Sequence, residues 1–215
     1  MEPRFSDLQA CIIDPEAPLV IVDVDEVLAQ FMRGFGTFVG RFGYELRVDR
    51  FALFQNIYRP GETEHLDLIA GKVLFDDFFR DGADDLLPAE GAAHALADLA
   101  SRAGVVILTN APEHGRLARG QWLKTHGFDY PLVINSGPKG PSAAQLASRT
   151  AGRSVFIDDL LPQLESVAAS APDITRFQMI SDERLRPLAP TAPERHVRID
   201  DWAELRTAIE AQLFA

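Results

Sequence analysis

The sequence lacks several features that would direct it toward particular classes of protein. Among its 215 residues there is one cysteine, Cys11, so a disulfide within the chain and a cysteine-rich zinc site are both excluded. No apolar run approaches the length of a membrane-spanning helix, and no basic start with a following apolar stretch opens the chain. We therefore expect no signal peptide, no membrane partner and a cytoplasmic location.

Positive charge is also scarce. The chain has 21 Lys and Arg against 32 Asp and Glu, which gives a formal net charge of −11. Such a chain repels phosphate backbones and shows no long basic run, so we expect no nucleic acid polymer as a partner. Glycine-rich phosphate loops, internal repeats and heptad arrays are absent, and the five histidines do not have the spacing of metal ligands.

Short apolar runs rich in β-branched residues are present, of the kind that form buried parallel strands. They lie at residues 19–24, 105–109, 132–135, 154–158, 176–180 and 196–199. Helical patterns separate most of them, at 92–102, 115–127, 142–152, 161–171 and 202–214. Strands that alternate with helices predict an α/β fold with a doubly wound, mostly parallel, Rossmann-like sheet.

One interval, between the first and second apolar runs, is much longer than a single crossover helix. Residues 28–88 are mostly helical in pattern, with breaks near Pro60 and Gly82. We predict that they form a small helical cap inserted after the first strand, while 1–27 and 89–215 form the α/β core. Ligands of open α/β sheets bind outside the carboxyl ends of the strands, so this insertion would roof the site.

Carboxylates follow two of the predicted strands. Asp23 and Asp25 end the first strand, and Asp158 and Asp159 end the fourth. These ends lie on one edge of a parallel sheet, where unpaired carboxylates would repel one another and raise each other's pKa. Mg²⁺ resolves this conflict, because it accepts a few carboxylates and keeps room for waters and a phosphate. The sequence therefore predicts Mg²⁺ as cofactor, with these four aspartates as candidate metal ligands.

Two further strands end in groups that suit a phosphate. The second strand ends in Thr109 and Asn110, and Lys139 follows the third in a loop of glycine and proline. Two aspartate pairs, a hydroxyl and a lysine fit phosphoryl transfer, which needs a nucleophile, a metal, a hydrogen-bond donor and a cation for the equatorial oxygens.

The order of these motifs resembles that of the haloacid dehalogenase superfamily. The matching segments are DVDEV at 23–27, ILTN at 107–110, Lys139 before a helix and FIDD at 156–159, all within the core from about residue 18 to 180. The helical insertion resembles the superfamily's cap of the first type. Asp25 places the chain near the phosphatase branch, since the dehalogenating branch lacks the second acid. The phenylalanine-rich cap bears a weak resemblance to the 5'(3')-deoxyribonucleotidases.

The resemblance implies roles for the first motif. Asp23 would be the nucleophile that forms an aspartyl-phosphate. Asp25 would be general acid to the leaving group and then general base for water, and its backbone carbonyl would also bind the metal. Two positions depart from the pattern: Glu26 stands where relatives often have Gly, and Val27 where many phosphatases have Thr. Neither removes a catalytic group, but Glu26 is left without an assigned role.

The resemblance also implies roles for the later motifs. Thr109 would donate a hydrogen bond to the transferring phosphoryl group, Lys139 would neutralise charge beside the nucleophile, and Asp158 would ligate Mg²⁺. Asp159 would be a ligand or a partner of one. Structural alternatives stay open, because Thr favours strands, a loop lysine is usually solvated and Asp is a good helix N-cap. For Asn110 a substrate contact and a turn-stabilising side chain are equally compatible with the sequence.

Phenylalanine recurs in the predicted cap at helical spacing. Phe31, Phe35, Phe38 and Phe42 fall on one helix face. Further phenylalanines follow at 51, 54, 75, 78 and 79. This pattern predicts the core of the cap itself, and the alternative is that some rings line a pocket and stack on an aromatic substrate group.

The function predicted from these features is a Mg²⁺-dependent phosphomonoesterase that acts on a small phosphorylated metabolite, with a (deoxy)nucleotide among the candidates. The main alternative is a non-catalytic protein of the same fold that binds a phosphorylated ligand or a partner. A third hypothesis is phosphoryl transfer to another acceptor, or carbon–phosphorus cleavage, which usually uses a Schiff-base lysine in the cap, where the sequence has Lys72. The oligomeric state is left open.

Overall fold

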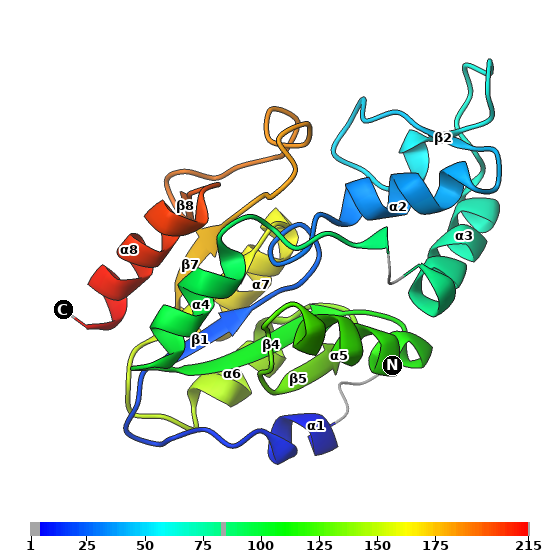
Figure 1. The fold of residues 1–215 in the computed structure, drawn as a ribbon. Helices are drawn as coiled ribbons and strands as arrows, with labels where there is room; N and C mark the ends of the chain where they lie inside the picture. The colour runs from blue at the N-terminus through cyan, green and yellow to red at the C-terminus, as the bar shows by residue number, and fades with distance from the viewer. Residues whose placement is uncertain (1–4, 83–84, 215) are drawn as a thin grey trace.

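A computed structural model describes residues 5–82 and 85–214, and a six-stranded sheet lies at its centre (Figure 1). The strands run in the order β5-β4-β1-β6-β7-β8, and all neighbouring pairs are parallel. They are β1 (Leu19–Val22), β4 (Gly104–Asn110), β5 (Leu132–Asn135), β6 (Ser154–Asp158), β7 (Thr175–Gln178) and β8 (Val197–Arg198). The predicted α/β class and parallel sheet are confirmed.

Helices cover both faces of this sheet. They are α1 (Phe5–Ala10), α4 (Ala92–Ala100), α5 (Arg116–Thr125), α6 (Gly140–Ala147), α7 (Leu161–Ser170) and α8 (Trp202–Leu213), with a short 3-10 turn η3 (Glu113–Gly115) before α5. None of the helices in the described ranges is both long enough and apolar enough to cross a membrane.

The position of strand β1 explains why its residues are apolar without a break, instead of alternating between apolar and polar. Val20 and Val22 belong to the apolar cluster that contains residues of α4, α5 and α8. Leu19 and Ile21 belong to the second cluster, with residues of α6 and α7. All four side chains are fully buried, as expected for the centre of a sheet with helices on both faces.

The predicted cap interval contains two helices and a feature that the sequence did not predict. The helices are α2 (Phe31–Gly40) and α3 (Leu68–Asp81). Between them, β2 (Glu45–Leu46) and β3 (Ile57–Tyr58) form a two-stranded antiparallel sheet, with the 3-10 turn η1 (Phe54–Asn56) before β3. Two-residue strands carry too few alternating positions to be recognised in a sequence. That 28–88 is a separate domain stays a prediction.

Most of the phenylalanines between α2 and α3 pack against one another. Phe31 and Phe35 of α2 both lie edge-on to Phe78 of α3, with ring centroids 5.2 and 5.4 Å away. Phe42 departs from the predicted face, because α2 ends at Gly40 and the Phe42 side chain is 57% exposed. The predicted apolar core of this segment is therefore present without Phe42.

The chain enters and leaves this segment side by side. Ala29 and Pro88 form an antiparallel bridge. The Gln30 N–H donates to the Leu87 carbonyl at 2.9 Å, and the Ala89 N–H donates to the Leu28 carbonyl at 2.8 Å. The two connections to the sheet are therefore paired as a short two-stranded ribbon.

Candidate active site

The strand order brings three of the predicted motifs together. Strand β1 lies between β4 and β6, so their carboxyl ends are neighbours. Asp23 follows β1 directly and its N–H donates to the Ile157 carbonyl at 3.0 Å. Thr109 lies near the end of β4, and Asp158 is the last residue of β6. The predicted convergence at one edge of the sheet is present.

A buried lysine joins two of these aspartates. The Lys139 Nζ lies 2.7 Å from Asp23 Oδ1 and 2.7 Å from Asp158 Oδ2. The Lys139 side chain is only 2% exposed, which excludes the alternative of a solvated loop lysine. Carboxylate oxygens of Asp23, Asp158 and Asp159 all lie within 4.8 Å of one another. One cation therefore faces three buried carboxylates.

The pKa shifts of these groups follow from this imbalance. Burial, with a further contribution from Asp23, raises the pKa of Asp158 to about 7, although Lys139 opposes the rise. Burial and the neighbouring Asp158 raise the pKa of Asp159 well above its usual value. Burial lowers the pKa of Lys139, but Asp158 and Asp23 more than offset this, so it is raised overall. The cluster therefore holds more negative charge than Lys139 can neutralise.

This donor set fits Mg²⁺. Its oxygens are hard, anionic and close together, and a divalent cation would supply the missing positive charge. Asp25 is the fourth carboxylate that was predicted to converge here, but its side chain is not in the cluster. The metal role predicted for Asp25 is therefore left to its backbone carbonyl. Asp158 also accepts a hydrogen bond from the Leu160 N–H at 2.9 Å. Helix α7 has no side-chain capping bond, so Asp159 is not its N-cap.

Thr109 has a buried hydroxyl that is free to donate. Its side chain is fully buried, and Oγ1 has no hydrogen-bond partner in the described part of the chain. Buried hydroxyls are nearly always satisfied, so an orphaned one calls for an explanation. A phosphoryl oxygen seated between Asp23 and Thr109 would satisfy it. This observation favours the functional interpretation of Thr109 over that of a plain strand residue.

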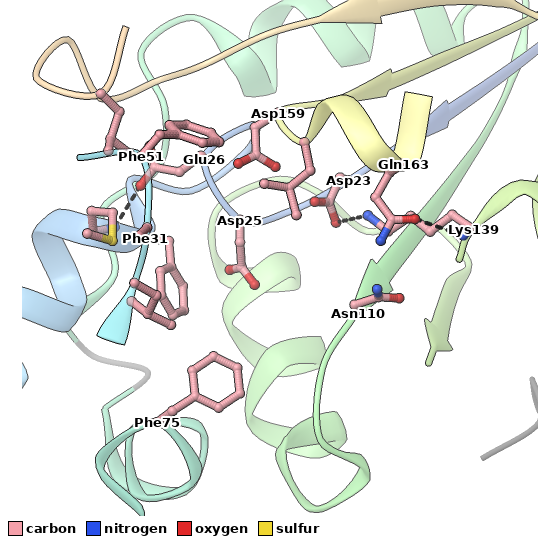
Figure 2. A pocket seen from close by; sticks show the side chains of 15 residues that line it. Asp23, Asp25, Glu26, Phe31, Phe51, Phe75, Asn110, Lys139, Asp159 and Gln163 are labelled. Carbon is pink, nitrogen blue, oxygen red and sulfur yellow. Dashed lines mark hydrogen bonds and ion pairs between the residues drawn. The ribbon is translucent and has the colours of Figure 1, made fainter. Parts of the chain in front are cut away.

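Asp25 has a partner that the sequence analysis missed. Arg119 of α5 donates to both of its carboxylate oxygens, with Nη1 2.7 Å from Oδ1 and Nη2 3.1 Å from Oδ2. The Arg119 side chain is 2% exposed and its guanidinium lies 4.9 Å from the centre of the Phe79 ring. In Figure 2 the Asp25 carboxylate points away from those of Asp23 and Asp159. Burial raises the pKa of Asp25, and Arg119 opposes that rise.

A sequence signal for Arg119 did exist. It lies three and four residues before Trp122 and Leu123, which are both buried. Residues at these spacings share one face of a helix, so Arg119 is an arginine on the apolar stripe of α5. A charged residue in that position needs a buried partner of opposite sign.

Glu26 joins three segments of the chain. It is 4% exposed and has φ = 58°, the one non-glycine residue with positive φ in the described ranges, a conformation that glycine adopts most readily. Its carboxylate accepts bonds from the Met32 N–H at 2.7 Å and from the Asp182 N–H and Ser181 hydroxyl at 3.0 Å each. Burial raises the pKa of Glu26 to about 7. Glu26 thus fastens the Asp23–Asp25 loop to α2 and to the segment after β7.

Asn110 supports the loop that carries Lys139. Its Nδ2 donates to the Gly137 carbonyl at 2.9 Å, and its Oδ1 accepts from Asn135 Nδ2 at 2.8 Å. The Lys139 N–H donates to Gln163 Oε1 at 2.8 Å, which fastens the same loop to α7. Asn110 also borders the cavity described next, so the structure shows its loop-stabilising contacts and leaves a substrate contact as a prediction.

A cavity of about 240 Å³ opens beside Asp23 (Figure 2). It is lined by Asp23, Asp25, Glu26, Asn110, Lys139, Asp159 and Gln163 together with Phe31, Met32, Phe51, Ala52, Leu53, Phe75, Leu160 and Leu185. The cavity therefore lies between the acidic edge of the sheet and the segment that contains α2 and α3.

Comparisons with known proteins find similarity at the level of structure. No protein-family model matches the chain, and no curated protein matches it in sequence. A conserved haloacid dehalogenase-like protein of unknown function from Agrobacterium tumefaciens matches with a TM-score of 0.61 at 18% identity, over 90% of this chain and 97% of the other. A HAD-superfamily hydrolase, subfamily IA, from Geobacter sulfurreducens matches with a TM-score of 0.56 at 15% identity, over 93% and 100%.

A further match has a named activity. The D,D-heptose 1,7-bisphosphate phosphatase from B. bronchiseptica, solved with magnesium and phosphate, has a TM-score of 0.51 at 14% identity, over 90% of this chain and 98% of that one. At identities this low, the structural matches establish a common fold and nothing more specific. They confirm the predicted superfamily resemblance at that level, and the phosphatase branch and cap type stay predictions.

Proposed function

We propose that this chain, which has the fold of the haloacid dehalogenase superfamily, is a Mg²⁺-dependent phosphomonoesterase of a small phosphorylated metabolite. The observation that carries the proposal is the buried Lys139 between Asp23 and Asp158, with Asp159 beside them. A salt bridge of this kind is costly to bury and brings little net stability, whereas phosphoryl transfer needs this combination of nucleophile and cation. The phosphatase with bound magnesium and phosphate among the structural matches supports it.

Asp23 would begin the reaction by attacking phosphorus with one carboxylate oxygen. The bond between phosphorus and the ester oxygen breaks, and the leaving alcohol takes a proton from Asp25. Water then attacks the aspartyl-phosphate and gives a proton back to Asp25, which releases phosphate and restores Asp23. Thr109 and Lys139 would donate hydrogen bonds to the phosphoryl oxygens in both steps.

Asp23, Asp158 and Asp159 would hold the Mg²⁺, together with the backbone carbonyl of Asp25. When bound, the metal offsets the charge of the phosphoryl group. Arg119 contributes differently, because it fixes the orientation of the Asp25 carboxylate in the substrate-free arrangement. The burial of Asp25 raises its pKa, which favours the protonated form that a general acid requires.

The proposal is tested by phosphate release from a panel of phosphate monoesters. We expect turnover with Mg²⁺, its loss when EDTA removes the metal, and recovery when Mg²⁺ is restored. Full activity in EDTA would refute the metal site. Binding of beryllium fluoride with Mg²⁺ but no turnover of any ester would instead support the alternative of a non-catalytic phospho-ligand-binding protein.

Replacement of Arg119 should slow the reaction and change its pH profile. We expect Arg119→Ala to lower kcat roughly 10²-fold, because Asp25 loses the fork that orients it. The limb of the pH profile that depends on ionised Asp25 should move to higher pH, since a cation that lowers this pKa is gone. Steady-state kinetics between pH 5 and 9 measure both effects.

Two further variants show whether Arg119 acts through Asp25. Arg119→Lys keeps the charge without the planar fork and should lie between the parent and Arg119→Ala. Arg80→Ala removes an arginine with a 59% exposed side chain and should leave the profile unchanged. A pH profile that does not shift in Arg119→Ala would mean that Arg119 does not lower the pKa of Asp25, and an unchanged kcat in the folded variant would mean that Arg119 does not orient it.

A further inference from the structure

The cavity beside Asp23 has two ends of opposite character. Figure 2 shows Asp23 and Lys139 on one side and the rings of Phe31, Phe51 and Phe75 across from them. Met32, Ala52, Leu53, Leu160 and Leu185 complete the apolar lining. If the phosphate of a substrate lies against Asp23, its leaving group therefore lies among aromatic and aliphatic side chains.

Most of the polar side chains around the cavity are already engaged with the protein, and the carboxylate of Asp159 belongs to the proposed metal site. The two oxygens of Glu26 accept bonds from backbone and hydroxyl donors. Both polar atoms of Asn110 are bonded, and Gln163 Oε1 accepts from the Lys139 N–H. Asp25 pairs with Arg119. A hydroxyl-rich leaving group would therefore lose its hydration here and find few unoccupied partners.

The charge of the lining disfavours a second anionic group. Lys139 is the one cationic side chain that lines the cavity in the part of the chain described, and it already lies between Asp23 and Asp158. The other charged lining residues are acids. A second phosphate or a carboxylate on the substrate would therefore meet repulsion and find no partner.

The size of the cavity indicates how much of a substrate it can enclose. A cavity of about 150 Å³ is large enough for benzene. The present volume of about 240 Å³ thus accommodates one ring and a short linker next to the phosphate. Several aromatic side chains around such a space favour stacked or edge-on packing with a flat group.

From these observations we infer that the substrate is a phosphate monoester of an alcohol that carries one aromatic or comparably apolar ring and no second anionic group. This inference rests on the proposed phosphomonoesterase function and specifies the class of its substrate. It differs from the sugar bisphosphate class named for one structural match.

The experiment compares three esters of primary alcohols, so that the chemistry of the leaving group is similar. They are 2-phenylethyl phosphate, glucose 6-phosphate and ethyl phosphate, each assayed with Mg²⁺. We expect kcat/KM for 2-phenylethyl phosphate to exceed that for glucose 6-phosphate by at least about 10²-fold, because each buried hydroxyl without a partner costs about tenfold. The excess over ethyl phosphate measures recognition of the ring.

Variants of the phenylalanines at the apolar end of the cavity test whether these side chains recognise the ring of the substrate. Phe51→Ala and Phe75→Ala should each lower the ratio of kcat/KM between 2-phenylethyl and ethyl phosphate roughly tenfold, and Phe51→Leu, which keeps apolar bulk, should lower it less. Phe42→Ala is the matched control, since Phe42 is exposed and lies outside the cavity. Melting temperatures show that each variant is folded.

The outcomes distinguish a failure of the inferred substrate class from a failure of the proposed phosphatase function. Glucose 6-phosphate used as well as 2-phenylethyl phosphate would overturn the substrate class and leave the phosphatase function standing. An unchanged ratio in folded Phe51→Ala and Phe75→Ala would overturn it as well. If other esters of the panel are hydrolysed but none of these three is, the substrate class alone fails. If no ester of the panel is hydrolysed, the proposed function fails and the inference fails with it.

Discussion

Asp23→Asn should reduce phosphate release by a factor on the order of 10⁴ or more, the scale of losses when an enzyme loses its nucleophile. The amide has almost the same shape as the carboxylate but cannot form an acyl-phosphate. Asp23 is 5% exposed and lies 2.7 Å from Lys139, so the variant also changes a buried ion pair. Phosphate release should therefore be measured together with the melting temperature.

The matched control is Asp173→Asn, the same substitution at an exposed position. It should leave turnover within the error of the assay. The nucleophile assignment would be wrong if folded Asp23→Asn retained more than about a tenth of the parent rate, because an asparagine cannot supply that chemistry. Beryllium fluoride, which mimics a phosphoryl group on the carboxylate, should bind the parent and not the variant.

Lys139→Met should destabilise the protein by about 3–5 kcal/mol near neutral pH, as expected when one partner of a buried ion pair is removed. Methionine fills similar space but leaves Asp23, Asp158 and Asp159 without their cation. We expect hydrolysis to be lost as well, and Mg²⁺ to restore part of the stability. Denaturant unfolding with and without Mg²⁺ measures these effects.

The loss of stability in Lys139→Met should depend on pH. The pKa of Asp158 is already raised from 3.8 to about 7, and removal of Lys139 raises it further. Between the pKa of Asp158 in the unfolded chain and its raised pKa in the folded protein, the folded state binds more protons than the unfolded state, so stability falls as pH rises. The deficit relative to the parent should thus be larger at pH 8 than at pH 5.

Lys124→Met is the control for this variant, because the Lys124 side chain is 74% exposed and makes only a distant pair. It should change stability by less than about 1 kcal/mol at either pH. A Lys139→Met protein as stable as the parent at pH 8 without metal would contradict the charge imbalance that underlies the proposed Mg²⁺ site.

The sheet and the acidic edge could be predicted because their signals are local. Val20 and Ile21 are neighbours with opposite faces buried, so β1 is continuously apolar. Asp23 and Asp158 each follow such a run directly, and parallel topology brings the ends of these runs together. Short stretches of sequence together with one rule of topology were enough for these elements.

The contacts of Arg119 and Glu26 could not be predicted in the same way. Arg119 meets Asp25 across 94 positions of sequence, and Glu26 meets Asp182 across 156. Such pairs depend on how α5 and the segment after β7 pack, which no local pattern specifies. An arginine on an apolar helix stripe and an acid at a tight turn show only that partners are needed. They do not show which residues those partners are.

The paired connections at Ala29 and Pro88 have a consequence for how a substrate enters. Because the two crossings are hydrogen-bonded to each other, they should bend together about one axis rather than separately. The rings of Phe31 and Phe78 pack edge-on and join α2 to α3, so the two helices should move together as one rigid unit. The carboxylate of Glu26 accepts a hydrogen bond from the Met32 N–H, which ties the start of α2 to the loop after β1. The segment that contains α2 and α3 would thus open from the acidic edge about a single hinge, and the contacts among its phenylalanines would be kept when it opens.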